Sequence, residues 1–287
     1  MVARIPVRHP VAGRRTRISR ASTRLTRTRF AAAACLLLAS GTFQWLTVAP
    51  DFALDPGEVR IDGLVHTSTD AALAAVELRE GVRPNVFRIR TDALQQALLA
   101  LPAITRAEVE VVLPDRLGIA VEERRPIFVW RVGGSDHLVD VEGVLFAVAG
   151  PALPVGLPVV EDRRAGAVAR LGERIDPLEL EIVRLLGAVT PEMLGSAAPG
   201  LTLAIDDRDG FVIHAPTGWR AVFGRYTPHL RTADLVDDQV QCLRSLLAGQ
   251  EAEIETVFLS PSAERCGTYR PRDVPAGSEP PAPSREP

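Results

Sequence analysis

Residues 101–130 read LPAITRAEVEVVLPDRLGIAVEERRPIFVW, and the middle of this stretch alternates apolar and polar side chains in two blocks, 109–113 and 117–121. Alternation with a period of two is typical of β-strands that bury one face. Residues 114–116, Pro-Asp-Arg, separate the blocks and favour a turn. The stretch therefore predicts a β-hairpin.

The chain upstream of this hairpin alternates between short extended and helical patterns. The expected segments are a strand at 58–63, a helix opened by Thr67 and Ser68 and stopped by Gly81, an extended piece at 86–90, and a helix from Thr91 that ends before Pro102. The second helix carries Leu94, Ala97, Leu98 and Leu101 at the spacing of one helix face. The order predicted over 56–124 is therefore β-α-(β)-α-β-β, a small α+β domain.

The first 50 residues differ in composition from the rest. Residues 1–29 form a basic arm without an acid, and residues 30–50, FAAAACLLLASGTFQWLTVAP, carry no charge. About 20 apolar residues span a bilayer as a helix, and Trp45 suits the membrane interface. A cleaved signal peptide is the alternative, but its basic region is usually short and no good small-x-small cleavage site lies nearby. A buried core helix would leave the arm unexplained. We therefore expect a transmembrane helix at 30–50.

The net charge of −3 hides an asymmetry about this segment. The first 30 residues hold nine arginines, whereas the chain from Asp51 onward holds 24 arginines against 36 acids, a net charge of −12. Basic residues before a span favour a cytoplasmic N-terminus, so we expect a single-pass type II membrane protein. The arm has neither interleaved aromatic residues nor a folded motif, which argues against nucleic acid as a partner.

All 33 basic residues are arginine, and this excludes several enzyme classes. A P-loop needs a lysine on the phosphates, and Schiff-base enzymes and serine–lysine hydrolases need a lysine as nucleophile or base. No histidine pair has metal-site spacing, and no GxSxG elbow occurs. Glu122 and Glu123 would point to opposite faces of a strand, and residues 206–210 favour a turn over a calcium loop. We expect no catalytic residue, no cofactor and no metal ion.

From residue 126 the pattern changes to short strands and two helices. Strands are expected at 127–132, 137–141, 144–147, 201–205, 211–215, 219–223, 254–259 and 264–270, and helices at 177–189 and around 236–247. These segments predict a second, β-rich α+β domain at 126–270. The proline-rich residues 271–287 are expected to be disordered. Cys242 and Cys266 lie in the outer part, and the sequence leaves open whether they pair.

The hairpin stretch, together with HLVDVEGVLF at 137–146, resembles the bacterial cell-division family FtsQ, also called DivIB. The sequences of that family are similar to the pattern LPWV…A.V.R.LP..L.I.V.ER.P.A.W, followed by LVD..G..F. The matching residues are Leu101, Pro102, Ala107, Val109, Leu113, Pro114, Leu117, Ile119, Val121, Glu123, Arg124, Pro126, Trp130, Val139, Asp140, Gly143 and Phe146. Residues 85–87, Asn-Val-Phe, lie where the family has NLF, whereas Ala103, Ile104 and Glu110 depart from the pattern.

The resemblance implies a fold and a role. The fold would be a single transmembrane helix, then a POTRA domain at 54–125, then the family's mixed, β-rich α+β domain at 126–270. The role would be a non-enzymatic scaffold in the bacterial cell membrane at the division septum. Such a scaffold links early and late division proteins and helps control septal peptidoglycan synthesis. Other division proteins would contact the POTRA domain and the membrane segment.

In this family the C-terminal strands bind the partners FtsB and FtsL, which add a strand to an exposed sheet edge. By position, the resemblance implies an edge strand at 264–270 with 254–259 beneath it. The partner-binding residues implied are Glu264, Arg265, Cys266, Gly267, Thr268, Tyr269 and Arg270. Tyr269 would be an anchor side chain or, alternatively, an ordinary half-buried strand residue.

The sequence leaves two other functions as alternatives. POTRA domains also occur in secretion and outer-membrane assembly proteins, where they handle other polypeptides. Those proteins continue into a β-barrel with aromatic girdles, whereas aromatic residues make up only 5% of this chain. A membrane-anchored cell-wall enzyme would need a convergent catalytic cluster, which the sequence does not offer.

Overall fold

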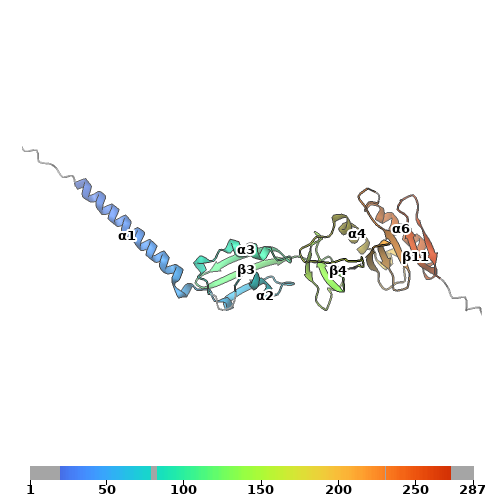
Figure 1. Ribbon diagram of the computed structural model, residues 1–287, viewed down its shortest axis with the longest axis horizontal. Coiled ribbons are helices and arrows are strands. Elements are labelled where there is room, and N and C mark those ends of the chain that lie inside the picture. The colour runs from blue at the N-terminus through green and yellow to red at the C-terminus, as the bar shows by residue number, and fades with distance from the viewer. Residues whose placement is uncertain (1–19, 79–82, 230, 273–287) are drawn as a thin grey trace, which may run out of the picture.

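The computed structural model describes residues 20–78, 83–229 and 231–272. The described chain is elongated: the long helix α1 (Arg20–Val48) lies at one end, a small sheet with two helices follows, and a larger sheet lies at the other end (Figure 1). Within α1, Thr28–Val48 is long and apolar enough to cross a membrane, which agrees with the helix expected at 30–50. The helix begins earlier than expected, inside the basic arm. The tail expected to be disordered lies outside the described residues, apart from Pro271 and Arg272.

The predicted hairpin forms most of a three-stranded sheet. The strands are β1 (Val59–Asp62), β2 (Ile104–Val112) and β3 (Arg116–Glu123), in the order β1-β3-β2. β2 and β3 are antiparallel, with Val109 opposite Ile119, while β1 runs parallel to β3, with Val59 opposite Leu117. Leu117 and Ile119 are buried in one core with side chains of the two helices, so the predicted alternation is confirmed.

Two helices, α2 (Thr69–Ala75) and α3 (Thr91–Leu99), pack against this sheet. Ser68 caps α2, because its hydroxyl accepts a backbone hydrogen bond from the first turn. The expectation that α2 continues to Gly81 is wrong, and Gly81 itself lies outside the described residues. The helix ends early because Glu77 has a left-handed φ of 56°, which a continuing helix cannot contain.

The extended piece expected at 86–90 is a further correction. Val86–Arg88 forms a 3-10 turn, η3, because the Asn85 side chain accepts a 3.0 Å hydrogen bond from the Phe87 N–H. Such local bonds compete with strand pairing. The nearest strand-like pairing is a single antiparallel bridge between Ala53 and Asn85, just before the expected piece. Among the described residues, this sheet therefore has one strand fewer than expected.

A nine-stranded sheet and its helices form the rest of the described chain. Its strands are β4 (Phe128–Val132), β5 (Ser135–Val139), β6 (Leu145–Val148), β7 (Val159–Asp162), β8 (Thr202–Asp206), β9 (Gly210–His214), β10 (Arg220–Gly224), β11 (Ile254–Leu259) and β12 (Gly267–Pro271). Their spatial order is β12-β11-β10-β9-β8-β7-β4-β5-β6, so β12 and β6 are the edges. Strand β7 was not expected, since the prolines before it hide its short pattern.

Three helices belong to this sheet: α4 (Pro177–Gly187), α5 (Pro191–Leu194) and α6 (Leu235–Leu247). α4 and α6 are the expected helices, and their buried side chains share one core with the sheet. Asp176 caps α4, and Pro177 occupies its first position, where proline is favourable. A smaller cluster that includes Val129, Leu138 and Phe146 packs around β4, β5 and β6.

Candidate partner-binding edge

Among the described residues, strand β12 lies at an edge of the nine-stranded sheet and pairs on one side only, with β11. The pairing is antiparallel, with Val257 opposite Tyr269 and Phe258 opposite Thr268. Four of the five residues of β12 are exposed. In Figure 1 its neighbour β11 lies at the end of the molecule away from α1. The unpaired backbone of an edge strand is a template on which another strand can add.

The hydrogen bonds at the two ends of β12 show which residues face β11. The Cys266 carbonyl accepts a hydrogen bond of 3.2 Å from the Ser260 N–H. At the other end, the Arg272 N–H donates to the Glu253 carbonyl at 2.6 Å. Both bonds belong to even-numbered residues of this segment. Because successive residues of an antiparallel strand alternate in direction, the even-numbered residues face β11 and the odd-numbered ones face the open side.

The open side of β12 is therefore short. Gly267 and Tyr269 each turn one N–H and one C=O toward it. Pro271 turns only a C=O, because proline has no N–H. An added strand thus finds two donors and three acceptors within β12. A proline on an edge strand also limits uncontrolled edge-to-edge association.

The side chains of β12 divide between the two faces of the sheet. Tyr269 lies on the same face as the buried Val257 opposite it and is 44% exposed. Arg270 lies on the other face, with its guanidinium carbon 5.8 Å from the ring centroid of Phe258. Tyr269 is therefore partly packed, yet keeps free aromatic surface beside the open edge.

Both ends of β12 are held in place. At its start, Cys266 forms a disulfide with Cys242 of α6, with a Cα–Cα distance of 5.2 Å. Gly267 has a φ of 150°, and a Cβ there would collide with the Phe258 carbonyl, so the close approach of the two strands needs glycine. After its end, the Arg272 guanidinium donates to the Thr217 carbonyl at 3.2 Å. The edge strand is thus a fixed element.

Three residues expected in the edge strand lie before it. Glu264, Arg265 and Cys266 belong to the turn between β11 and β12, in which the Arg265 N–H donates to the Ser262 carbonyl at 3.2 Å. The three residues line, with α6, a groove of about 360 Å³. The expected strand at 254–259 is β11, which lies beside β12 in the sheet instead of beneath it.

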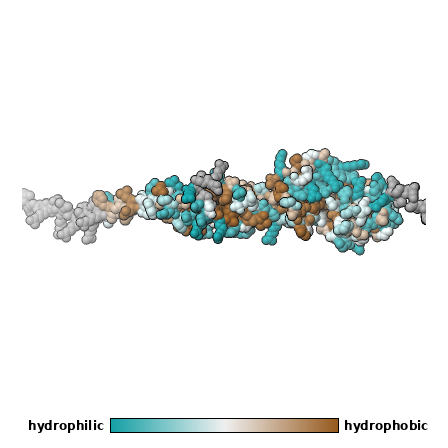
Figure 2. All heavy atoms as spheres, turned by 90° about the horizontal axis from the view of Figure 1, so that it is seen from below, coloured by the Kyte–Doolittle hydropathy of each residue, from teal (hydrophilic) through white to brown (hydrophobic). Residues whose placement is uncertain are grey.

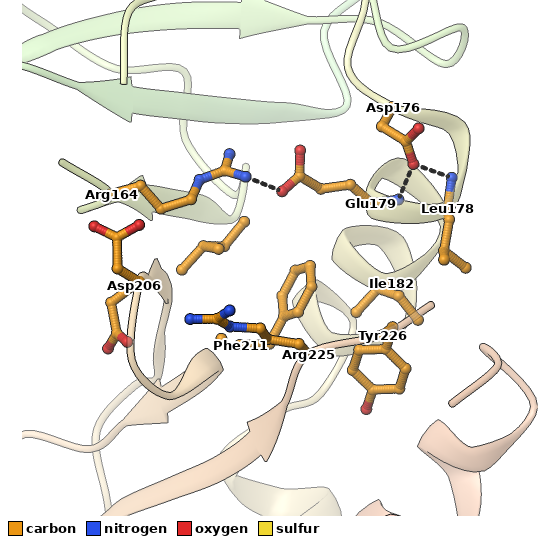
Figure 3. Close-up of a pocket in the computed structure, with 12 residues that line it drawn as sticks. Arg164, Asp176, Leu178, Glu179, Ile182, Asp206, Phe211, Arg225 and Tyr226 are labelled. Carbon is orange, nitrogen blue, oxygen red and sulfur yellow. Dashed lines mark hydrogen bonds and ion pairs between the residues drawn. The ribbon is translucent and has the colours of Figure 1, made fainter. Parts of the chain in front are cut away.

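A second concave site lies near α4 and has a volume of about 390 Å³ (Figure 3). Across it, Arg164 and Glu179 form an ion pair of 2.8 Å, and Asp162 accepts from Arg164 at 2.8 Å. Burial raises the pKa of Glu179 in spite of the neighbouring Arg164. Asp176 accepts from the first turn of α4, as the dashed lines show. These polar groups serve the fold, and none forms a nucleophile–base pair. Within the described ranges, no group of three or more His, Cys, Asp or Glu could hold a metal ion.

Comparison with known proteins shows what this chain is similar to. Residues 55–124 match the POTRA domain, FtsQ-type. A cell division protein FtsQ of Chloroflexus aurantiacus is 33% identical over 138 residues, 48% of this chain and 49% of the relative. That of Burkholderia pseudomallei is 35% identical over 43% of this chain and 47% of the relative. A longer match, to FtsQ of Anaeromyxobacter sp., is 28% identical over 84% of this chain and 78% of the relative.

The chain contains an FtsQ-type POTRA match and is similar to several cell division proteins FtsQ. It spans about half the length of the first two FtsQ relatives, 49% and 47%. The FtsQ-type POTRA match coincides with the three-stranded sheet and its helices.

The FtsQ pattern also explains residues at the junction of the two sheets. Glu123 accepts hydrogen bonds from three successive backbone N–H groups, including those of Val65 at 3.1 Å and Thr67 at 2.9 Å. Arg124 donates to the Pro102 carbonyl at 2.9 Å and forms an ion pair with the buried Asp140. The ER and LVD parts of the FtsQ pattern therefore meet in space.

One organising residue escaped the sequence analysis. The carboxylate of Glu251 accepts hydrogen bonds from the Ser196 hydroxyl at 2.6 Å, the Trp219 indole at 2.7 Å and the Ala197 N–H at 2.9 Å. Burial alone would raise the pKa of Glu251, but these bonds outweigh it and the pKa is lowered. Its partners lie 32 to 55 positions away, so no local pattern marks it.

Proposed function

We propose that this protein is a non-enzymatic scaffold of the bacterial cell-division machinery. The relatives named cell division protein FtsQ and the FtsQ-type POTRA match support a division role. We take 1–29 as a cytoplasmic arm, 54–125 as the POTRA domain and 126–270 as the β domain. The apolar helix α1 and the nine arginines in the first 30 residues support a single-pass type II anchor in the cytoplasmic membrane, at the division septum.

The observation that carries the proposal is the open side of β12. A partner segment of the FtsB or FtsL kind would add there as an extended strand, and main-chain hydrogen bonds would supply much of its affinity. Tyr269 would add a side-chain contact beside the added strand, because its ring is 44% exposed. Through these partners the scaffold would help control septal peptidoglycan synthesis.

The proposed pairing is tested with two substitutions at one position. Tyr269→Pro removes an outward N–H and keeps the inward bonds, so we expect it to weaken binding of FtsB-like and FtsL-like proteins from the same genome by at least about tenfold, since it removes both a main-chain bond and the ring. Tyr269→Ala removes the ring alone and should weaken binding less. Binding is measured with the full-length protein in detergent.

Glu110→Ala is the control, because Glu110 is exposed on β2, outside the sheet that contains β12, and it should leave binding unchanged. Deletion of 264–287 should abolish binding. Retained binding by the deletion would refute the edge assignment, while normal division after depletion of the protein would refute the division role.

A further inference from the structure

The end of α1 meets the POTRA domain through a row of three aromatic rings. Trp45, in the last turn of α1, packs edge-on to Phe52 with ring centroids 6.2 Å apart. Phe52 packs in turn against Phe87 of η3 at 5.1 Å. Trp45 is 56% exposed and Phe87 is 43% exposed. Two large rings are thus left open beside the end of an apolar helix.

This row is fixed to the helix by polar bonds as well. The Asn85 side-chain amide donates to the Leu46 carbonyl of α1 at 2.9 Å. The Ala49 N–H donates to the Trp45 carbonyl at 2.8 Å, which carries the helical bonding up to the start of the POTRA domain. The position of η3 relative to the end of α1 is therefore set by the fold.

The surroundings of α1 indicate what covers these rings. Its leucines 36–38 are exposed, so the helix has no protein surface around it in the described chain. In Figure 2 the coloured part of this helix is brown, while much of the outer region is teal and white. Aromatic rings concentrate where a spanning helix leaves the hydrocarbon, since they combine apolar faces with tolerance of the polar interface.

We propose that Trp45, Phe52 and Phe87 seat the POTRA domain on the outer surface of the bilayer that α1 crosses. This inference rests on the membrane anchor proposed above and extends it to the folded domain. Phe87 lies at the headgroup level beside Trp45, and Arg88 of the same turn is exposed next to it. The first domain then has one orientation on the membrane instead of swinging on a tether.

The test uses nitroxide labels on the full-length protein in phospholipid nanodiscs. The free, exposed Cys35 takes a label directly, since the other two cysteines are paired. In a Cys35→Ser chain, Arg88→Cys reports on η3 and Val155→Cys, a fully exposed site of the large sheet region, reports on water. We expect collisions with a water-soluble nickel chelate to be at least about threefold rarer at position 88 than at 155, because the interface excludes the chelate.

Phe87→Ser should raise the collision rate at position 88 to that at 155. Leu99→Ser is the matched control, because Leu99 is 41% exposed in the same domain at the far end of α3. It should leave position 88 protected.

An unprotected position 88 in the labelled chain with Phe87 intact overturns the proposal, even if Phe87→Ser disturbs folding. Should the label at Cys35 then lie in lipid, the anchor stands and only the docking fails. Should it lie in water, the anchor fails too. Protection that survives Phe87→Ser in a folded domain also overturns the role of the rings.

Discussion

At the scale of single residues, Glu123 shows how one carboxylate can organise a loop. Burial alone would raise its pKa, but the hydrogen bonds from Thr67, His66 and Val65 outweigh burial, and the pKa lies below the ordinary value of 4.5. A carboxyl whose folded pKa is depressed stabilises the fold above its unfolded pKa. That stabilisation is lost as the pH falls through the folded pKa.

We expect Glu123→Gln to lower the unfolding free energy at pH 7 by about 1–2 kcal/mol, a value reduced for partial solvent exposure. The difference should shrink as the pH falls from 4.5 through the lower folded pKa, because the unfolded carboxyl is protonated first and the native one follows. Denaturant titrations at neutral and acid pH measure both effects. Glu122→Gln is the control, since the Glu122 side chain is exposed on the other face of β3. Equal pH dependence in the two variants would contradict the role of Glu123.

The contacts of individual side chains were the part of the structure that the sequence predicted least. The pattern could mark Glu123 and Arg124 only through family resemblance, and it could not say that they hold the 65–67 loop and Asp140. The pairing of Cys242 with Cys266 stayed open because cysteine spacing does not encode distance in space. Both gaps have one cause: partners that are distant in sequence are brought together by the fold.

At the scale of elements, the disulfide ties the edge strand to α6 across 24 residues of sequence separation. We expect the double substitution Cys242→Ser with Cys266→Ser to lower the unfolding free energy by about 3 kcal/mol, because the unfolded chain regains the entropy of this loop. Affinity for a strand-adding partner should fall with it, since β12 loses one of its two fixed ends.

Thermal unfolding and partner binding check this expectation, with Cys35→Ser as the control that changes neither. A dithiol reductant added to the unsubstituted protein should reproduce the double substitution. If reduction lowers stability while binding stays at its original strength, the disulfide supports the fold without holding the edge.

Elements were predicted well wherever periodicity is long and uninterrupted. The hairpin of β2 and β3 and the amphipathic α6 follow directly from apolar spacing. The failures are short elements decided by one local interaction. Asn85 converts an expected strand into η3, and the left-handed Glu77 stops α2. Strand β12 begins at 267 instead of the expected 264, because residues 264–266 belong to the turn after β11.

At the scale of the whole molecule, the junction between the sheets sets the shape. The Arg124 side chain is 18% exposed and pairs with Asp140, which also accepts from the Val144 N–H at 2.9 Å. A ring contact of 5.3 Å between His66 and Phe146 adds to the same junction. Removal of Arg124 would leave a buried carboxylate without its cation, which is costly.

We expect Arg124→Ala to cost roughly 2–3 kcal/mol of stability, at the low end for a buried pair because Arg124 keeps some solvent contact. It should also broaden the distribution of distances between spin labels placed on the two sheets, measured by pulsed electron resonance. Arg125→Ala, at an exposed neighbouring position, is the control and should leave the distribution narrow. An equally narrow distribution for Arg124→Ala would show that the remaining contacts suffice.

The placement of the open edge at the end of the molecule away from α1 has a consequence for capture (Figure 1). On the topology and strand addition proposed above, a partner rooted in the same bilayer would meet β12 only if its own stalk on that side of the membrane is long enough to reach it. A stalk of matching length gives the two proteins a high effective concentration, whereas a shorter one forbids the encounter altogether. The length of this molecule would then restrict binding to partners whose stalks reach β12, whatever side chains those partners carry.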